Sequence, residues 1–367
     1  MKKILYLGSC GSNWPPNTTP IQRAIFLERH FEIDYVDTAD TLHEFLGKNI
    51  GTRYYKVDKF SLNNVDTLSN NIIYDYIWCG PSWKVVAIAQ KLARNIRAKI
   101  VIDMFDHERL PAGVAWNKNQ FIKAIYFELM ALKLREMIKE CDIFIHAIGN
   151  DISSYSLNKN TQTVHCLNGQ SPELISSIRN INTSEGGFSI CYVGEASDER
   201  TPILKSILQT ANILDTELNL NIVGFCNKKY LKEIKECAGS KINVFFHPFM
   251  PWVDAMQIVL ASDLCLHLFP DRQDLACVYP LKIAEYLALG KPVLAPNLPG
   301  VIMMLGKSLI ECVMPNSDPM KWVNFFIEIK GNSTLRNSLK DKALLRAKEL
   351  EWDTIHSPLL DILKKNE

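Results

Sequence analysis

Short apolar segments alternate with longer amphipathic ones along nearly the whole chain, and no other feature limits its fold as strongly. In the first half this alternation predicts strands at Lys3–Leu7, Ile33–Asp37, Tyr74–Cys79, Lys99–Met104, Ile143–Ala147 and Gln162–Leu167. Helices are predicted between several of them, at Ile21–His30, Lys84–Ile96 and Phe121–Glu140. Continuous apolar strands separated by helices are typical of a parallel sheet covered on both faces, so the first half is predicted to be α/β.

Residues 171–187 interrupt this pattern. Ser, Asn, Thr and Gly dominate the second half of the segment, as expected for a linker that follows one short helix. The alternation then restarts, with strands predicted at Phe188–Val193, Leu220–Gly224, Val244–His247, Leu264–Leu268, Pro292–Ala295 and Leu309–Val313. Helices are predicted around Ile203–Leu214, Tyr230–Cys237, Val253–Ala261, Pro280–Leu289 and Met320–Ile329. The sequence therefore predicts two doubly wound, Rossmann-like domains, 1–170 and 188–350, which a length of 367 residues accommodates.

The C-terminal tail is predicted to be almost entirely helical. It runs from Ser333, a candidate N-cap, to Lys365, and a break is expected near Glu351–Asp353.

Composition excludes several classes of protein. A net charge of +1 gives no support for binding to nucleic acid or another acidic polymer. None of the ten cysteines forms a CxxC pair, so we interpret them as small buried residues in a reducing compartment and expect no disulfide framework and no metal site. The apolar run after Lys3 is too short for an export signal and no segment is long enough to span a membrane, so the protein is predicted to be cytoplasmic. The chain contains no GxGxxG motif, which weighs against a nicotinamide cofactor.

The segment Cys277–Ala295 carries the strongest signal for chemistry. Pro280 suits the start of a helix, Gly290 suits the position just past its end, and Pro292 prevents its continuation. Unpaired N–H groups at such a helix start can hold a diphosphate, to which Lys282 would add a positive charge. Glu285, three residues later, could accept the hydroxyls of a ribose. An exposed Lys–Glu pair on a solvated helix explains the same residues equally well.

Residues 280–293 closely resemble the P-x-K-x-x-E-Y-x-A-x-G-K-P-V motif of the retaining GT-B glycosyltransferases of family four. Other matching segments follow the order of that family: Ile102–Glu108, Cys166–Gly169, Tyr192–Gly194 with the later Arg200, and Ser262–Leu266. The resemblance covers nearly the whole chain and is strongest from about residue 188 to 300. It implies two Rossmann-like domains that face each other, with residues 351–367, beginning near Trp352, crossing back onto the N-terminal domain.

The resemblance also implies a set of site residues. Glu285 would bind the donor ribose, and Phe249 would lie at the base. The donor phosphates would be held by Lys282, Arg200, the loop at Gly194 and the backbone of Pro280 and Leu281. His107, with its neighbour Asp106, would act near the transferred sugar. The donor would be a nucleotide-diphospho-sugar, transferred with retention and with no metal or other cofactor.

One residue departs from the family pattern. Many members have a glutamate where this chain has Cys277, and a thiol cannot replace a carboxylate as an acceptor for sugar hydroxyls. Asp271 and Asp274 lie nearby and are candidates to compensate. The family's usual lysine in the first donor loop is replaced by Arg200 with shifted spacing, and a guanidinium can grip phosphate through two hydrogen bonds.

The acceptor is expected on the N-terminal domain. The loop after the first strand contains Gly11, Ser12, Asn13 and Trp14, and the tryptophan suits either stacking on a sugar ring or packing within the loop. A glycan, a lipid-linked sugar or a small molecule would each serve as acceptor. The helix Phe121–Glu140 carries Lys123, Lys133, Arg135 and Lys139; core packing with a solvated charged face is the favoured interpretation, and peripheral contact with an anionic membrane is the alternative.

Three other functions remain open at this point. A sugar-nucleotide epimerase or hydrolase would use a similar site for a different reaction. A non-catalytic homologue acting as a partner subunit would follow if Cys277 disables the site. A solute-binding module would leave the 280–293 segment unexplained.

Overall fold

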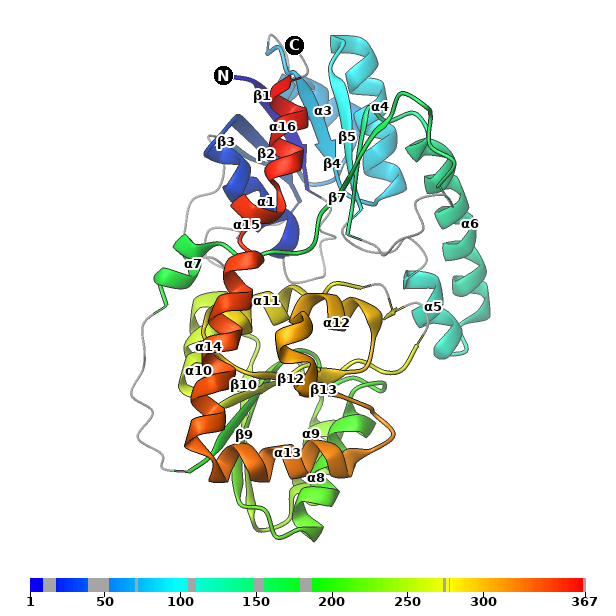
Figure 1. Cartoon of the computed structure of the whole chain (residues 1–367). Helices are drawn as coiled ribbons and strands as arrows, with labels where there is room; N and C mark the ends of the chain where they lie inside the picture. Colours follow the sequence, from blue (N-terminus) through cyan, green and yellow to red (C-terminus); the bar gives the residue numbers. More distant parts are fainter. Residues whose placement is uncertain are drawn as a thin grey trace. The chain divides into compact units, whose positions relative to one another are not determined.

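The computed structural model describes residues 1–8, 18–38, 53–69, 72–104, 110–147, 155–178, 187–272, 275–276 and 278–365. These residues form two compact units, one made of Met1–Asn168 together with Trp352–Glu367 and the other of Gly169–Glu351. Each unit is built on its own parallel sheet (Figure 1). The fold is therefore α/β with two doubly wound sheets, as the alternation of the sequence predicts.

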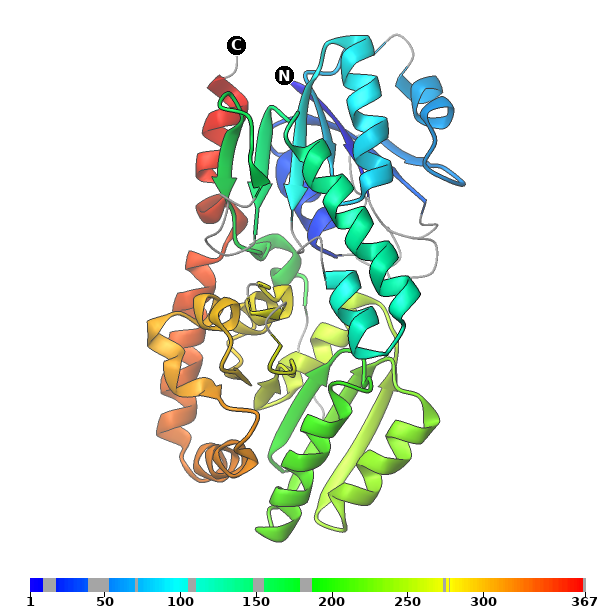
Figure 2. The same cartoon turned by 90° about the vertical axis from the view of Figure 1, so that its right-hand side faces the viewer.

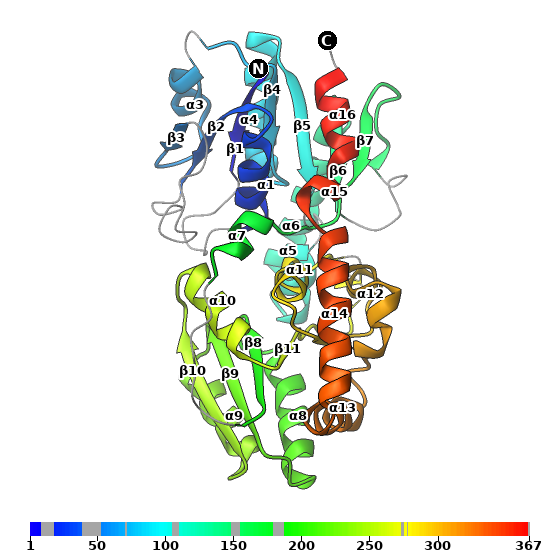
Figure 3. The same ribbon diagram turned by 60° about the vertical axis from the view of Figure 1, so that its left-hand side comes forward.

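The first unit contains a seven-stranded sheet of order β3-β2-β1-β4-β5-β6-β7. Its strands are β1 (Lys3–Leu7), β2 (Glu32–Asp37), β3 (Arg53–Lys56), β4 (Tyr76–Cys79), β5 (Lys99–Met104), β6 (Ile143–His146) and β7 (Gln162–His165). Its helices are α1 (Thr18–Glu28), α3 (Leu62–Ser69), α4 (Trp83–Ile96), α5 (Leu110–Asn117), α6 (Phe121–Ile138), α15 (Trp352–Ile355) and α16 (Ser357–Lys365). In Figure 3, α1 lies on the side of β1 and β2, and α16 (red) lies on the side of β6 and β7.

The last two helices are part of this first unit although they end the chain. The hydroxyl of Tyr76 on β4 donates to the carbonyl oxygen of Leu363 at 2.8 Å. Trp352 is fully buried, and the guanidinium of Arg23 lies 5.3 Å from the centre of its ring. Arg23 in turn forms a fully buried ion pair with Asp103 at the end of β5. The end of the chain thereby completes the core above β1 and β4.

The second unit contains a six-stranded sheet of order β10-β9-β8-β11-β12-β13. Its strands are β8 (Ser189–Val193), β9 (Leu218–Gly224), β10 (Ile242–Pro248), β11 (Leu264–Leu266), β12 (Val293–Pro296) and β13 (Val313–Met314). Its helices are α7 (Pro172–Ser176), α8 (Thr201–Ile213), α9 (Lys228–Ala238), α10 (Trp252–Ala261), α11 (Leu281–Ala288), α12 (Pro299–Leu305), α13 (Pro319–Gly331) and α14 (Ser333–Glu349). The central strands β8, β11 and β12 are mostly buried and largely apolar, as expected for strands covered on both faces. The edge strand β10 is mostly half exposed, and its neighbour β9 alternates Leu with Asn at its start.

Several local predictions need correction. The strand expected at Leu309–Val313 is mostly a 3-10 helix, Lys307–Cys312, and only Val313–Met314 joins the sheet. The cap of α14 is Asn332, whose side chain accepts from the N–H of Leu335 at 2.9 Å, so Ser333 is the first helical residue.

The elements β3, α3, α5 and α12 were not predicted. All four are short, and none has a long periodic pattern that would reveal it.

Among the described residues, no helix is long and apolar enough to cross a membrane. The cysteines within these ranges are free thiols, most of them buried, as expected. Burial raises the pKa of Cys166, Cys191 and Cys312 to about 12, so these thiols stay protonated and behave as small apolar side chains.

Candidate functional site

The sheet of the second unit reverses its strand order beside β8. From β8 the chain moves outward through β9 and β10, and then returns to place β11 on the other side of β8. The two strands are parallel, with Leu266 opposite Tyr192, so their carboxyl ends lie next to each other. Ligands of open α/β sheets bind at such a point, where the loops separate in opposite directions and leave a crevice.

The loop that leaves β8 approaches its neighbours closely at Gly194. A Cβ atom there would lie 2.9 Å from the hydroxyl of Tyr192 and 3.2 Å from Nζ of Lys282. On the neighbouring strand, Gly224 has a φ of +129°, and a Cβ there would lie 2.4 Å from the carbonyl oxygen of Gly194. Two glycines therefore let the loop after β8 lie flat across the end of the sheet.

Lys282 is fixed in the first turn of α11. Its ammonium donates to the carbonyl oxygen of Val193, the last residue of β8, at 2.8 Å. Burial, and then the positive charge of Arg200, lower the pKa of Lys282 to about 8, although Glu285 and Glu195 act in the opposite direction. A cation so placed is more stable beside an anion, because an anion compensates for the solvent that burial removes.

Arg200 lies at the other side of the same loop, as the residue that caps α8. Its guanidinium donates to the carbonyl oxygen of Glu195 at 3.5 Å and lies 5.4 Å from the ring centre of Phe269. The hydroxyl of Tyr192 donates to the same carbonyl at 2.8 Å. The structure thus brings Arg200 and Lys282, which are far apart in sequence, to one end of the sheet.

Glu285 lies one turn after Lys282 on α11 and is only 3% exposed. Its Oε1 accepts a hydrogen bond from the indole N–H of Trp252, at the start of α10, at 2.8 Å. The carboxylate is therefore a positioned group, and the alternative of an exposed Lys–Glu pair on a solvated helix is wrong. A hydrogen-bonded carboxylate with so little exposed surface presents only a small edge to a ligand.

The ends of α11 follow the predicted pattern with one small difference. Pro280 is the N-cap residue and the helix begins at Leu281, so the backbone at the helix start is close to where it was predicted. Gly290 adopts a φ of +68° two residues past the last helical residue, Ala288, as its position after the helix predicts.

Phe249 forms part of an aromatic pair at the carboxyl edge of the sheet. Its ring stacks on that of Phe225, with the ring centres 4.9 Å apart and the planes at 14°. Both side chains are half exposed, and they follow the neighbouring strands β10 and β9. The sequence drew attention only to Phe249, because the pairing of Phe225 with it depends on the strand order.

His267 is a residue that sequence reasoning missed. It directly follows β11, is 6% exposed, and its Nε2 has no hydrogen-bond partner within the described part of the chain. Burial, with Lys282 and Arg200 nearby, holds its pKa well below the ordinary value, so the imidazole is neutral. A histidine at the end of a buried strand was the available signal, and only the fold shows that it lies beside the two cations.

Asp271 is held by the side chain amide of Asn316, which donates to its Oδ1 at 3.0 Å and to the carbonyl oxygen of Phe269 at 2.7 Å. Arg272, the next residue, forms an ion pair with Glu199. The loop after β11 is therefore tied to the loop before α8.

The remaining predicted site residues lie outside the described ranges. They are the catalytic candidates Asp106 and His107, the donor candidates Asp274 and Cys277, and the acceptor candidates Gly11, Ser12, Asn13 and Trp14. Their roles stay predictions. Within the described residues, no group of three His, Cys, Asp or Glu side chains is arranged to hold a metal ion.

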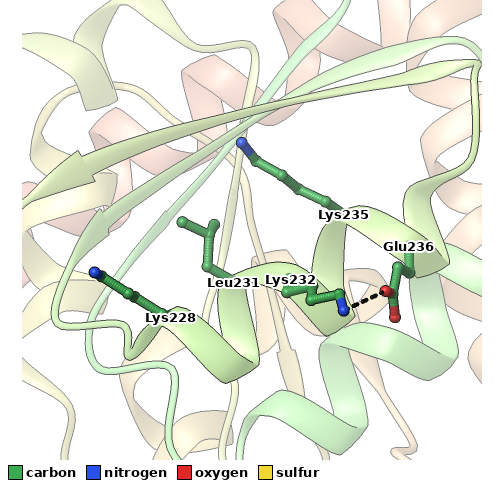
Figure 4. A pocket seen from close by; sticks show the side chains of 5 residues that line it. All are labelled: Lys228, Leu231, Lys232, Lys235 and Glu236. Carbon is green, nitrogen blue, oxygen red and sulfur yellow. Dashed lines mark ion pairs between the residues drawn. The ribbon is translucent and has the colours of Figure 1, made fainter.

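A shallow hollow of about 480 Å³ lies elsewhere in the second unit, against α9. Its lining residues are Lys228, Leu231, Lys232, Lys235 and Glu236. All of them come from one helix, the three lysine side chains diverge, and Lys232 pairs with Glu236 (Figure 4). The hollow therefore offers no convergent set of polar groups, and we do not assign it to the site.

Comparison with known proteins relates the second unit to a sequence family. Residues 176–346, nearly all of the second unit, match the sequence profile of the family described as glycosyl transferases group 1. No curated protein sequence gives a significant match.

Solved structures resemble the chain over its full length. HepE of Anabaena in complex with UDP-glucose has a TM-score of 0.73 at 15% identity, covering 99% of this chain and 100% of that one. Sucrose-phosphate synthase from Thermosynechococcus elongatus has a TM-score of 0.71 at 13% identity, covering 100% and 99%. A putative UDP-N-acetylglucosamine 2-epimerase from Listeria monocytogenes has a TM-score of 0.60 at 11% identity, covering 100% and 98%. At such identities the likeness concerns the fold alone.

Proposed function

We propose that this chain is a GT-B glycosyltransferase that transfers a hexose from a nucleotide-diphospho-sugar to an acceptor hydroxyl. The proposal is supported by the match of the second unit to glycosyl transferases group 1 and by the likeness of the fold to sucrose-phosphate synthase. The donor diphosphate binds at the carboxyl ends of β8 and β11. Arg200 and Lys282 hold its charge, together with the backbone at the start of α11.

The observation that carries this proposal is the position of Lys282, whose ammonium donates to the carbonyl oxygen at the end of β8 at 2.8 Å, with Arg200 at the same end of the sheet. Burial, and then Arg200, lower the pKa of Lys282 to about 8. A diphosphate beside this ammonium would stabilise its charge and raise that pKa again. A solvated surface lysine would not have this property.

The chemistry of transfer matches such a site. The bond between the anomeric carbon and the diphosphate oxygen breaks, and the acceptor oxygen forms a bond to the same carbon while its proton passes to the departing diphosphate. The nucleoside diphosphate leaves with the electron pair of the broken bond. Fixed cations stabilise this departing charge most where water is excluded, without a requirement for a metal. We propose retention at the anomeric carbon from the family resemblance, and His107 and Asp106 remain the candidates to act at the sugar.

The rest of the donor would bind along the same edge of the sheet. The stacked rings of Phe225 and Phe249 offer an apolar surface to the base, and the small exposed edge of Glu285 would accept from the ribose. UDP-glucose is the first donor to test, because the HepE structure contains it. The acceptor is a glycan, a lipid-linked sugar or a small molecule, and we propose that the reaction takes place in the cytoplasm.

The experiment measures nucleotide binding and turnover together. Purified protein is titrated with UDP, GDP and ADP by calorimetry, and is then incubated with the matching nucleotide sugars while release of the nucleoside diphosphate is followed. We expect one nucleotide to bind clearly best. Lys282→Ala should weaken its binding about ten- to a hundredfold, because it removes a charged hydrogen-bond donor.

Lys291→Ala is the matched control. Lys291 also lies near α11, and burial lowers its pKa. It precedes β12, however, and so lies at the amino ends of the strands, whereas the proposed phosphate site lies at their carboxyl ends. Its loss should leave nucleotide affinity unchanged. Equal weakening by both substitutions would contradict the assignment of the phosphate site.

Product analysis separates the proposed transfer from its alternatives. Nucleoside diphosphate release that depends on an added acceptor supports transfer. Conversion of the nucleotide sugar to its epimer without an acceptor would instead indicate the reaction named for the Listeria structure. Tight binding with neither reaction, over a broad set of acceptors, would indicate a non-catalytic homologue in which Cys277 has replaced an essential carboxylate.

A further inference from the structure

Helix α6 in the first unit is apolar on two opposite faces. Its inner face is formed by Ala124, Ala131, Leu134 and Ile138, which are buried against the unit. Its outer face carries a second row of large apolar side chains, all about half exposed or more: Ile122, Ile125, Tyr126, Leu129 and Leu132. At about 100° per residue this outer row spans roughly 120° and lies opposite the buried one. The favoured prediction of core packing is met on the inner face, but it did not foresee the exposed apolar row that lies among the charged residues.

The exposed row continues beyond the helix start. Trp116 at the end of α5 and Phe121 at the start of α6 are both exposed, and their rings meet edge to face with centres 5.9 Å apart. Figure 2 shows α5 and α6 at the front of their unit. We call Trp116, Phe121, Ile122, Ile125, Tyr126, Leu129 and Leu132 the outer stripe. Large apolar side chains gathered on one exposed face mark an interaction surface, so the outer stripe indicates a partner.

The charged residues at the N-terminal end of the outer stripe are all positive. From residue 110 to 127 the sequence contains Lys118 and Lys123 but no Asp or Glu. Both lysines are exposed, and Lys123 lies 5.8 Å from the ring centre of Phe127. Lys133, further along, lies 4.0 Å from the ring centre of Trp83. Exposed aromatic and aliphatic residues bordered by lysines are the composition of helices that lie in the interface of a bilayer.

We propose that the outer stripe docks on an anionic membrane surface, with α6 lying in the plane of the interface. The apolar side chains enter the boundary between headgroups and acyl chains, while Lys118 and Lys123 meet the headgroup charges. The helix lies flat instead of spanning, because it carries five charged residues: Lys123, Glu128, Lys133, Arg135 and Glu136.

Charge complementarity indicates an anionic lipid surface as the occupant. Lys118 and Lys123 are exposed at the N-terminal end of the outer stripe, where the sequence contains no Asp or Glu. Lysines near a bilayer surface are attracted by anionic headgroups. This inference does not depend on the proposed reaction.

Sedimentation with lipid vesicles tests the proposal. Full-length protein is mixed with vesicles of phosphatidylcholine, or of phosphatidylcholine with about one third phosphatidylglycerol, and the bound fraction is measured as salt is raised. We expect binding to the anionic vesicles that weakens with salt. The double variant Ile122→Glu, Leu129→Glu should lower the partition coefficient at least about tenfold, because it places carboxylates in the apolar layer.

Ile73→Glu is the matched control. Ile73 belongs to the same unit and is 85% exposed, close to the 89% of Ile122, but lies outside the outer stripe. It should bind vesicles as the wild type does, and both variants should keep the wild-type melting temperature. Lys118→Gln with Lys123→Gln should weaken binding to anionic vesicles only.

Three results would overturn the proposal. The first is no binding of the wild type to anionic vesicles, and the second is equal loss in the Ile73→Glu control. The third is a wild-type dimer, seen by light scattering, that the Ile122→Glu, Leu129→Glu variant converts to a monomer without any vesicle binding. That last result would identify a second copy of the chain as the occupant.

Discussion

At the scale of single residues, Lys282 is expected to make nucleotide binding depend on pH. Its pKa is about 8 in the free protein, and a bound diphosphate would raise it, so binding takes up a proton above pH 8. Affinity for the preferred nucleoside diphosphate is expected to fall about tenfold between pH 7 and pH 9, because about nine tenths of the lysine has lost its proton at pH 9. Calorimetric titrations at the two values measure this.

Lys282→Arg is the variant that isolates the effect. Arginine keeps its charge throughout this range, so its affinity should change little with pH. An equal fall in the variant and the wild type would show that another group is responsible.

A second residue-scale prediction concerns His356. It is fully buried in the first unit against Trp352 and Phe26, and neither ring nitrogen has a hydrogen-bond partner among the described residues. Burial, and then Arg23, hold its pKa well below the ordinary value. Below pH 6.5 the unfolded chain binds a proton at His356, whereas the folded chain does not. The free energy of unfolding should therefore fall by about 1.4 kcal/mol for each pH unit below 6.5.

Substitution by a residue without a charge should remove this loss. Denaturant unfolding of wild type and His356→Leu at pH 7 and pH 5 gives the difference in the free energy of unfolding. We expect the variant to lose about 2 kcal/mol less than the wild type over this interval. The same loss in both proteins would assign the acid sensitivity to other groups.

At the scale of elements, the glycines at the ends of β8 and β9 decide how closely the loop after β8 approaches the sheet. Gly224→Ala would place a Cβ 2.4 Å from the carbonyl oxygen of Gly194 at a φ that side chains rarely adopt. The expected cost is about 1–3 kcal/mol of stability together with weaker nucleotide binding, because the loop must move. Thermal unfolding and calorimetry measure the two effects.

Gly331→Ala provides the control at the end of α13. No atom lies within 4 Å of the Cβ that it would add. It should be neutral or slightly stabilising and leave binding intact. A neutral Gly224→Ala would mean that the loop does not need its close approach.

At the scale of the whole molecule, the two C-terminal helical segments serve different units. Leu339 on α14 is fully buried in the second unit, and Leu363 on α16 is fully buried in the first. Leu363→Ala and Leu339→Ala should each cost about 2–5 kcal/mol. Hydrogen exchange should then rise in β1 and β4 for Leu363→Ala, and in the central strands β8 and β11 for Leu339→Ala.

These two variants control for each other, since they make the same substitution of a fully buried leucine in different units. Faster exchange in both units from either change would show that the units unfold together. That outcome would contradict the prediction that α16 stabilises the first unit alone.

Much of the molecule followed from local sequence patterns. Strand runs such as 3–7 and 99–104, and the helix that begins beside Pro280, are visible because burial on both faces requires continuous apolar residues and because proline and glycine mark helix ends. The positions of Lys282 and Glu285 on that helix were likewise predictable. The roles of His107, Trp14 and Cys277 remain predictions, since those residues lie outside the described ranges.

The tertiary structure alone decided which distant residues meet. Lys282 reaches Val193, and His267 lies beside Lys282 and Arg200, because the strand order places β11 next to β8; no local periodicity contains that order. Likewise Trp252 reaches Glu285, and residues 352–365 join the unit that begins the chain. The sequence by itself determined the elements, since their formation depends on neighbours a few residues apart. The site depended on pairings across the sheet, whose energies arise only when the elements pack.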